Sequence, residues 1–151
     1  MTIKVYLAAG FFNDFQNEAL NYIEKTLDSL PEFDVFSPRR ETKLDGFEKP
    51  EVQQKVFDLN CKHIEEADLV VASTVDKDCG TLFECGYANK AGIPIIYTLF
   101  DARLDDANFN LMLSKSGIAH FTDELKFMDF IKKLTKKNIK TSKVEYEGEF
   151  E

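Results

Sequence analysis

Short apolar, strand-like segments alternate with helix-like segments along almost the whole chain, and this alternation constrains the fold more than any other feature. The strand-like runs are rich in β-branched residues, whereas the helix-like segments repeat apolar residues at intervals of three and four. We expect strands at 3–8, 33–36, 68–73, 94–100 and 118–121, and helices at 14–30, 51–67, 81–91, 108–115 and 123–137.

Strands that are separated by helices pair in parallel, so the pattern predicts an α/β fold. Right-handed crossovers favour a doubly wound, flavodoxin-like or Rossmann-like parallel five-stranded sheet with helices on both faces. Ligands bind beyond the carboxyl ends of such strands, where loops 8–14, 37–50 and 74–81 are expected. The 151 residues fit a single domain, with about 138–151 as a C-terminal tail.

Charge and composition narrow the class of partner. The net charge of −8 disfavours nucleic acid and anionic membranes. The longest apolar run, 93–100, is too short to span a bilayer, and the N-terminus lacks the apolar stretch of a signal peptide. Three cysteines and two histidines, without a CxxC pair, argue against a zinc site and for a reducing compartment. We therefore expect a cytoplasmic protein without a bound metal.

The common cofactor and nucleophile motifs are missing. No GxGxxG follows the first strand, no GxxxxGK[ST] occurs, and no GxSxG marks a nucleophilic serine. The two histidines, His63 and His120, offer little material for a catalytic triad, and the position of His63 on a helix face is typical of a core or cap residue. Carboxylates are the remaining candidates for catalysis.

The most informative carboxylate is Glu84, which follows a strand, a polar loop and a helix start. One interpretation is structural. Gly80 permits a tight turn, Thr81 can cap the helix, and Glu84 stands three residues later, as in a capping box.

The second interpretation is catalytic. Glu84 is flanked by apolar residues at the expected ligand crevice, and an ionised carboxylate in a shielded pocket can attack a sugar carbon of oxocarbenium character. Asp78 or Asp76 could then give a proton to the leaving group. One acid and one nucleophile are the minimal pair for retaining glycosyl chemistry.

Four ordered segments and the tail resemble the nucleoside 2-deoxyribosyltransferase family, over nearly the whole chain. The segments are KVYLAAGFFNDFQN at 4–17, FSPR at 36–39, ADLVVASTVDKDCGTLFECGYA at 67–88 and NLM at 110–112, and the tail is YEGEFE. The third is similar to the family's D-x-GT-x-x-E-x-G-x-A pattern.

This resemblance implies a base-exchange reaction that needs no cofactor. Glu84 falls on the nucleophile that attacks C1′ of the deoxyribose, Asp78 on the acid that handles the proton of the base, and Tyr6 on the tyrosine that holds the nucleophile. A purine or pyrimidine then takes the sugar from a deoxyribosyl-enzyme ester. Expected partners are 2′-deoxyribonucleosides and free bases.

The resemblance also implies a homo-oligomer, because Asn110 falls on an asparagine that reaches a neighbouring subunit's site. Phe11 and Phe12 fall on the aromatic loop that lines the base pocket. The predicted substrate-binding residues are Gly10, Phe11, Phe12, Asn60, Asp76, Asn110 and Met112.

One position departs from the family. Where its members commonly carry an aspartate, this chain has Asn60, which can hydrogen-bond a base or a sugar hydroxyl but cannot be a carboxylate. This difference bears on base preference and relative rate.

Each assigned role has a structural alternative. Tyr6 fits a core position, Phe11 and Phe12 fit packing under a loop, and Asn110 and Asp78 fit helix caps.

Two rival functions stay open. The first is hydrolysis of deoxynucleoside 5′-monophosphates, whose phosphate needs donors such as arginine. Relatives with that activity carry a serine in place of Asn110, and serine and arginine in the first loop, where this chain has Phe11 and Phe12. Arg39 and Arg40 are the residues that could still bind a phosphate. The second rival is a non-catalytic nucleoside-binding protein.

Overall fold

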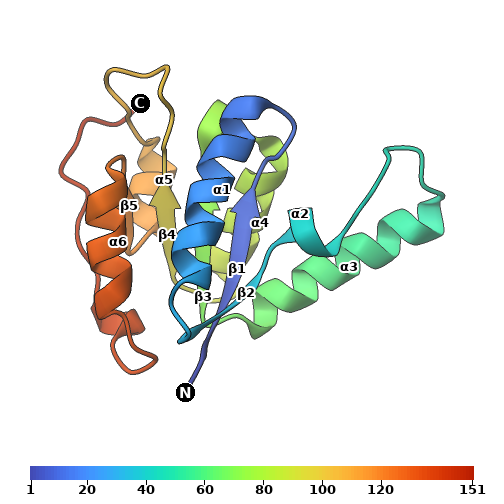
Figure 1. Cartoon of the computed structure of the whole chain (residues 1–151), viewed down its shortest axis with the longest axis horizontal. Helices are drawn as coiled ribbons and strands as arrows, with labels where there is room; N and C mark the ends of the chain where they lie inside the picture. Colours follow the sequence, from blue (N-terminus) through green and yellow to red (C-terminus); the bar gives the residue numbers. More distant parts are fainter.

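The computed structural model describes all 151 residues and shows a five-stranded sheet with α1 (Asp14–Asp28) on one face and α4 (Cys79–Lys90) on the other (Figure 1). All strand pairs are parallel, in the order β2-β1-β3-β4-β5, which confirms the predicted flavodoxin-like architecture. The strands are β1 (Ile3–Ala9), β2 (Phe33–Phe36), β3 (Leu69–Ser73), β4 (Ile95–Thr98) and β5 (Ala119–Phe121).

The helices begin where short polar side chains can satisfy their free N–H groups. Asn13 caps α1, Asn110 caps α5 and Asp123 caps α6, each by accepting from a backbone N–H. The other elements are α2 (Pro38–Glu41), α3 (Pro50–Glu66), α5 (Leu111–Ser116), α6 (Glu124–Lys133) and the 3₁₀ turns η1 (Val75–Lys77) and η2 (Ile139–Thr141). No helix is both long and apolar enough to cross a bilayer.

The core lies on both faces of the three central strands. Every residue of β3 is buried, and Val70 and Ile96 are fully inaccessible. Burying such a side chain contributes about 1.5–3 kcal/mol. The central strands therefore form a rigid platform, and the loops at their carboxyl ends are held in place by it.

Most element boundaries differ from the predicted ones by one to four residues, and three differences have a clear physical cause. The expected loop 37–50 contains the short helix α2, which begins at Pro38 because proline fits the first helical position. The last helix ends at Lys133, not at 137, because the side chain of Asn138 donates to the Lys133 carbonyl and accepts from Thr135 N. The tail is packed, since Val144 N donates to Ile118 O.

Helix α3 extends beyond the sheet, so its predicted apolar side is only partly covered (Figure 1). Val52 and Leu59 are 41% and 39% exposed, and Ile64 is the one buried residue of the helix. His63 stacks on Phe36 with ring centroids 3.7 Å apart, as expected for a packing residue. A cavity beside α4 is lined by Val56, Phe57, Asn60, Cys61 and Ile64 of α3.

Candidate active site

Glu84 and Tyr6 form a hydrogen-bonded pair between α4 and β1. The Tyr6 hydroxyl donates to Oε2 of Glu84. Tyr6 itself is fully buried, and its ring stacks on Phe36 at 5.7 Å between centroids. Packing of α4 on the sheet therefore fixes the donor and aims it at one carboxylate oxygen.

Burial controls the charge of this carboxyl group. The loss of hydration raises the pKa of Glu84 to about 8, from an ordinary 4.5, because the charged form is disfavoured away from water. The Tyr6 hydroxyl acts in the opposite direction, since donation to a carboxylate favours the ionised form. Glu84 is thus a shielded carboxyl group that exchanges its proton near neutral pH.

Asp78 caps α4, and this corrects the expected helix start. Its Oδ2 accepts from the backbone N and from Oγ1 of Thr81, both at 2.9 Å, so the helix begins at Cys79. A carboxylate at this position interacts with the helix dipole, which a threonine hydroxyl cannot match. The capping-box interpretation of Glu84 is therefore wrong, and the expected capping role of Asp78 is confirmed.

A cavity of about 320 Å³ brings five of the predicted site residues together. They are Phe11, Phe12, Asn60, Asp78 and Glu84. The cavity lies between the loop after β1, the α2–α3 region and the first turns of α4. Two carboxyl groups, one amide and an aromatic wall thus share one crevice, where the fold predicts a ligand.

Aromatic rings form the walls of this Glu84 cavity. Phe11 and Phe12 stack with centroids 5.1 Å apart, and Phe57 and Phe83 approach to 5.9 Å. Sequence reasoning missed Phe57, Phe83 and Leu44 as lining residues. Their aromatic and aliphatic character is typical of core residues, so the sequence carried no signal that they stay half-exposed.

Gly10 lies behind the cavity and permits a close approach. A Cβ at this position would stand 2.6 Å from Nε2 of Gln16 and 3.0 Å from Cβ of Asp78. Gln16, which sequence reasoning also missed, is buried and accepts from Phe12 N at 2.8 Å. A polar residue on the buried side of an otherwise amphipathic helix was the available signal. Gly10 and Gln16 position the aromatic loop, and neither lines the cavity.

Asn110 and Met112 do not reach this cavity within one chain. They line a separate cavity of about 410 Å³, together with Cys85 and Gly86 of α4. The side chain of Asn110 accepts from Met112 N and donates to the backbone carbonyl of Glu151, which confirms its helix-capping role.

Asp76, the alternative proton donor, also lies outside the Glu84 cavity. It accepts from Asn13 at 2.7 Å and from Arg103 at 2.6 Å. These hydrogen bonds lower the pKa of Asp76, so it stays ionised and is a poor acid. Of the two candidates, only Asp78 is placed beside Glu84.

The arginines near the cavity are engaged elsewhere. Arg39 donates to Asn17, Asn21 and Glu24 of α1, and Arg40 pairs with Asp28. No lysine or arginine lines the Glu84 cavity. No group of three or more His, Cys, Asp or Glu side chains is arranged to hold a metal ion.

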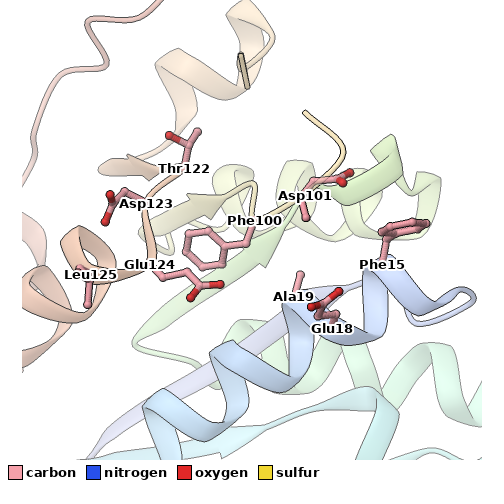
Figure 2. A pocket seen from close by; sticks show the side chains of 10 residues that line it. Phe15, Glu18, Ala19, Phe100, Asp101, Thr122, Asp123, Glu124 and Leu125 are labelled. Atoms are coloured by element: carbon pink, nitrogen blue, oxygen red, sulfur yellow. The ribbon is translucent and has the colours of Figure 1, made fainter. Parts of the chain in front are cut away.

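A further cavity of about 410 Å³ lies between α1 and the segments that follow β4 and β5. Figure 2 shows Glu18 and Phe15 of α1 on one side and Asp123 and Glu124 on the other. It contains none of the predicted site residues, so the candidate active site stays at Glu84.

Comparison with known proteins supports the flavodoxin-like fold and identifies the family to which the chain belongs. A family model described as nucleoside 2-deoxyribosyltransferase matches residues 5–123. The chain therefore belongs to the nucleoside 2-deoxyribosyltransferase family, a family of nucleoside-processing enzymes that act as transferases or N-glycosidases.

Similar proteins include both types of activity. A 2-deoxyribosyltransferase from Bacillus psychrosaccharolyticus is 27% identical, with a TM-score of 0.74 over 94% of this chain and 97% of that one. A Thermofilum pendens protein described as a 2′-deoxynucleoside 5′-phosphate N-hydrolase is 31% identical over 70% of this chain and 74% of its own length. A Clostridium botulinum CMP N-glycosidase shares the fold, at 17% identity and a TM-score of 0.57 over 85% of this chain and 98% of that one.

Proposed function

We propose that the protein is a nucleoside 2-deoxyribosyltransferase that exchanges the base of a 2′-deoxyribonucleoside. The carboxylate of Glu84 attacks C1′, the C1′–N bond breaks, and the departing base takes a proton from Asp78. A second base then attacks C1′ through a ring nitrogen. Its N–H proton goes to Asp78 as the ester bond breaks and frees Glu84. Two displacements at C1′ retain its configuration.

The observation that carries this proposal is the buried Tyr6–Glu84 hydrogen bond at the edge of an aromatic cavity that also holds Asp78. A structural role does not account for this pair, because Asp78 already caps α4 and Glu84 is not used as a cap. The pair leaves Oε1 of Glu84 without a donor from Tyr6, so that oxygen is available for attack.

The charge of the cavity favours an uncharged nucleoside over a 5′-monophosphate. Arg39 and Arg40 are paired with α1, and the cavity carries two carboxyl groups without a lining cation. In the reactive form, in which Glu84 is ionised, a phosphate dianion would be repelled by this carboxylate unless a cation were supplied. Hydrolysis of nucleotides stays the second candidate, on account of the 31% identity to the Thermofilum pendens protein described as such an enzyme.

We also propose that a neighbouring copy of the chain contributes Asn110 and Met112 to the Glu84 cavity. Met112 is 74% exposed, and Phe12 and Phe83 are 76% and 53% exposed beside the cavity. Apolar surface of this kind is typical of an interface. A second copy would cover these rings and exclude water from the ester intermediate.

The decisive assay uses deoxyinosine or thymidine as the donor and adenine or cytosine as the acceptor, with products resolved by liquid chromatography. A new deoxynucleoside that forms only when the acceptor is present supports transfer. Free base without a new nucleoside, or activity confined to 5′-monophosphates, indicates a hydrolase. Binding without turnover indicates a nucleoside-binding protein.

A further inference from the structure

Resting on the proposed function, we propose that the side-chain amide of Asn60 forms a hydrogen bond with the base. Rotation of this amide would let the site bind both amino and oxo bases. Asn60 lies on α3 and lines the Glu84 cavity. Its Oδ1 is buried, nothing in the chain donates to it, and its amide nitrogen forms no hydrogen bond within the chain. The fold therefore leaves both ends of this amide unassigned.

The other polar side chains of the cavity are engaged. The Thr42 hydroxyl donates to Pro38 O at 2.7 Å, Asp78 accepts from Thr81, and Glu84 accepts from Tyr6. Asn60 is the lining residue that carries both a strong donor and a strong acceptor and uses neither. Buried polar groups are normally paired, and no hydrogen bond within the chain fixes which end of this amide faces the cavity.

The bases differ in the hydrogen-bonding group that they would present to such an amide. Adenine and cytosine present an amino donor, whereas hypoxanthine and thymine present a carbonyl acceptor. Rotating the Asn60 amide by about 180° exchanges its oxygen and its nitrogen, and no hydrogen bond in the chain opposes that rotation. The base therefore selects the orientation, while Phe11 and Phe12 supply stacking surface that does not depend on base identity.

A carboxylate in place of this amide would behave differently, because it only accepts hydrogen bonds. Asn60→Asp keeps the size of the side chain and should shift the ratio of kcat/KM for 2′-deoxyadenosine over deoxyinosine by about tenfold toward deoxyadenosine at pH 7. Lys55→Gln is the matched control, since it also makes α3 more negative by one charge, at an exposed position outside the cavity.

A second variant removes the amide altogether. In the wild type, deoxyadenosine should be used more efficiently than purine 2′-deoxyriboside, which lacks the 6-amino group. In Asn60→Leu this preference should fall to about one, with a melting temperature within a few degrees of the wild type. An unchanged preference in a folded Asn60→Leu protein would overturn the inference.

The experiment also separates this inference from the proposed function. If the wild type transfers or releases no base, the proposed function fails, and the inference is tested by calorimetric titration with adenine, hypoxanthine and purine. Binding of adenine and hypoxanthine that weakens about tenfold in Asn60→Leu, while purine binding is unchanged, supports a base-reading role for Asn60. Equal loss for all three bases, or no binding by the wild type, overturns it.

Discussion

The hydroxyl of Tyr6 donates to Oε2 of Glu84 inside the protein, whereas the hydroxyl of Tyr87 donates to Oε1 of Glu65 on its surface. The two pairs have the same chemistry and differ in their surroundings. Burial raises the pKa of Glu84 to about 8, while Glu65 is exposed. The surface pair is therefore an internal control for every test of the buried pair.

Replacing Glu84 with glutamine should leave a folded protein that has lost at least about 10³-fold in kcat, because the amide cannot form the glycosyl ester. Mass spectrometry of wild type with a deoxynucleoside and no acceptor should show a covalent adduct that Glu84→Gln lacks. Glu65→Gln should keep both the adduct and the turnover. A folded Glu84→Gln protein with normal base exchange would refute the assignment of the nucleophile.

Replacing Tyr6 with phenylalanine should change the pH profile more than KM. Removing a hydrogen bond to a carboxylate disfavours the ionised form, so the pKa of Glu84 should rise by about one to two units. Because the nucleophile must be ionised, wild-type kcat/KM should rise with pH through about 8, and this limb should move to higher pH in Tyr6→Phe. The profile of Tyr87→Phe should match the wild type; equal shifts in both variants would contradict the role of Tyr6.

The raised pKa of Glu84 also predicts how stability depends on pH. Between about 4.5 and about 8 the native state holds this proton while the unfolded chain releases it, so the stabilising contribution is complete below 4.5 and is lost as pH rises through 8. Glu84→Gln has no such loss. It should be more stable than wild type at pH 9, by up to about 5 kcal/mol, with the difference vanishing near pH 4. Thermal melts at several pH values would measure this, and a constant difference would argue against a shifted pKa.

The periodicity of apolar residues in the sequence was sufficient to predict the five strands of the sheet. The strand at 33–36 was predicted with its observed bounds, since an apolar run between turn residues defines a short strand locally. The start of α4 was predicted incorrectly, at Thr81. Asp78 and Thr81 both favour a cap position, and tertiary structure decided between them. Local preference is weak where two good caps stand three residues apart.

Five residues of the Glu84 cavity were among those predicted from the sequence, whereas the grouping of the predicted residues into one cavity was not predictable. The pattern around Glu84 marked the carboxylates, and the resemblance marked Tyr6 and Asn60. That Asn110 would line a different cavity of the same chain depends on long-range packing that no local pattern encodes. The pairing of Arg39 with Glu24 is likewise a tertiary contact.

Selectivity against phosphate should follow from the missing cation. We expect kcat/KM for 2′-deoxyadenosine to exceed that for its 5′-monophosphate by roughly 30-fold or more, since an effective dielectric near 20 leaves about 2 kcal/mol of repulsion at 8 Å. Leu44→Arg, at the edge of the cavity, should reduce this ratio. Arg39→Met should lower the stability of the fold, because the ion pair with Glu24 is lost, and should leave this kcat/KM ratio unchanged. A ratio below one in the wild type would favour the nucleotide hydrolase.

Shared sites between subunits can be tested by mixing two inactive proteins. Asn110→Ala should lower activity strongly if Asn110 completes a neighbour's cavity, although it lines another cavity of its own chain. In a mixed oligomer, a subunit with intact Glu84 can meet a neighbour with intact Asn110, so co-refolded Glu84→Gln and Asn110→Ala proteins should regain part of the wild-type activity. Mixing Glu84→Gln with Glu84→Ala is the control, because no intact nucleophile is present. Absence of recovery in an oligomer shown to contain both variants would mean that each site is built within one chain, and that Asn110 acts through its cap of α5 and its bond to Glu151.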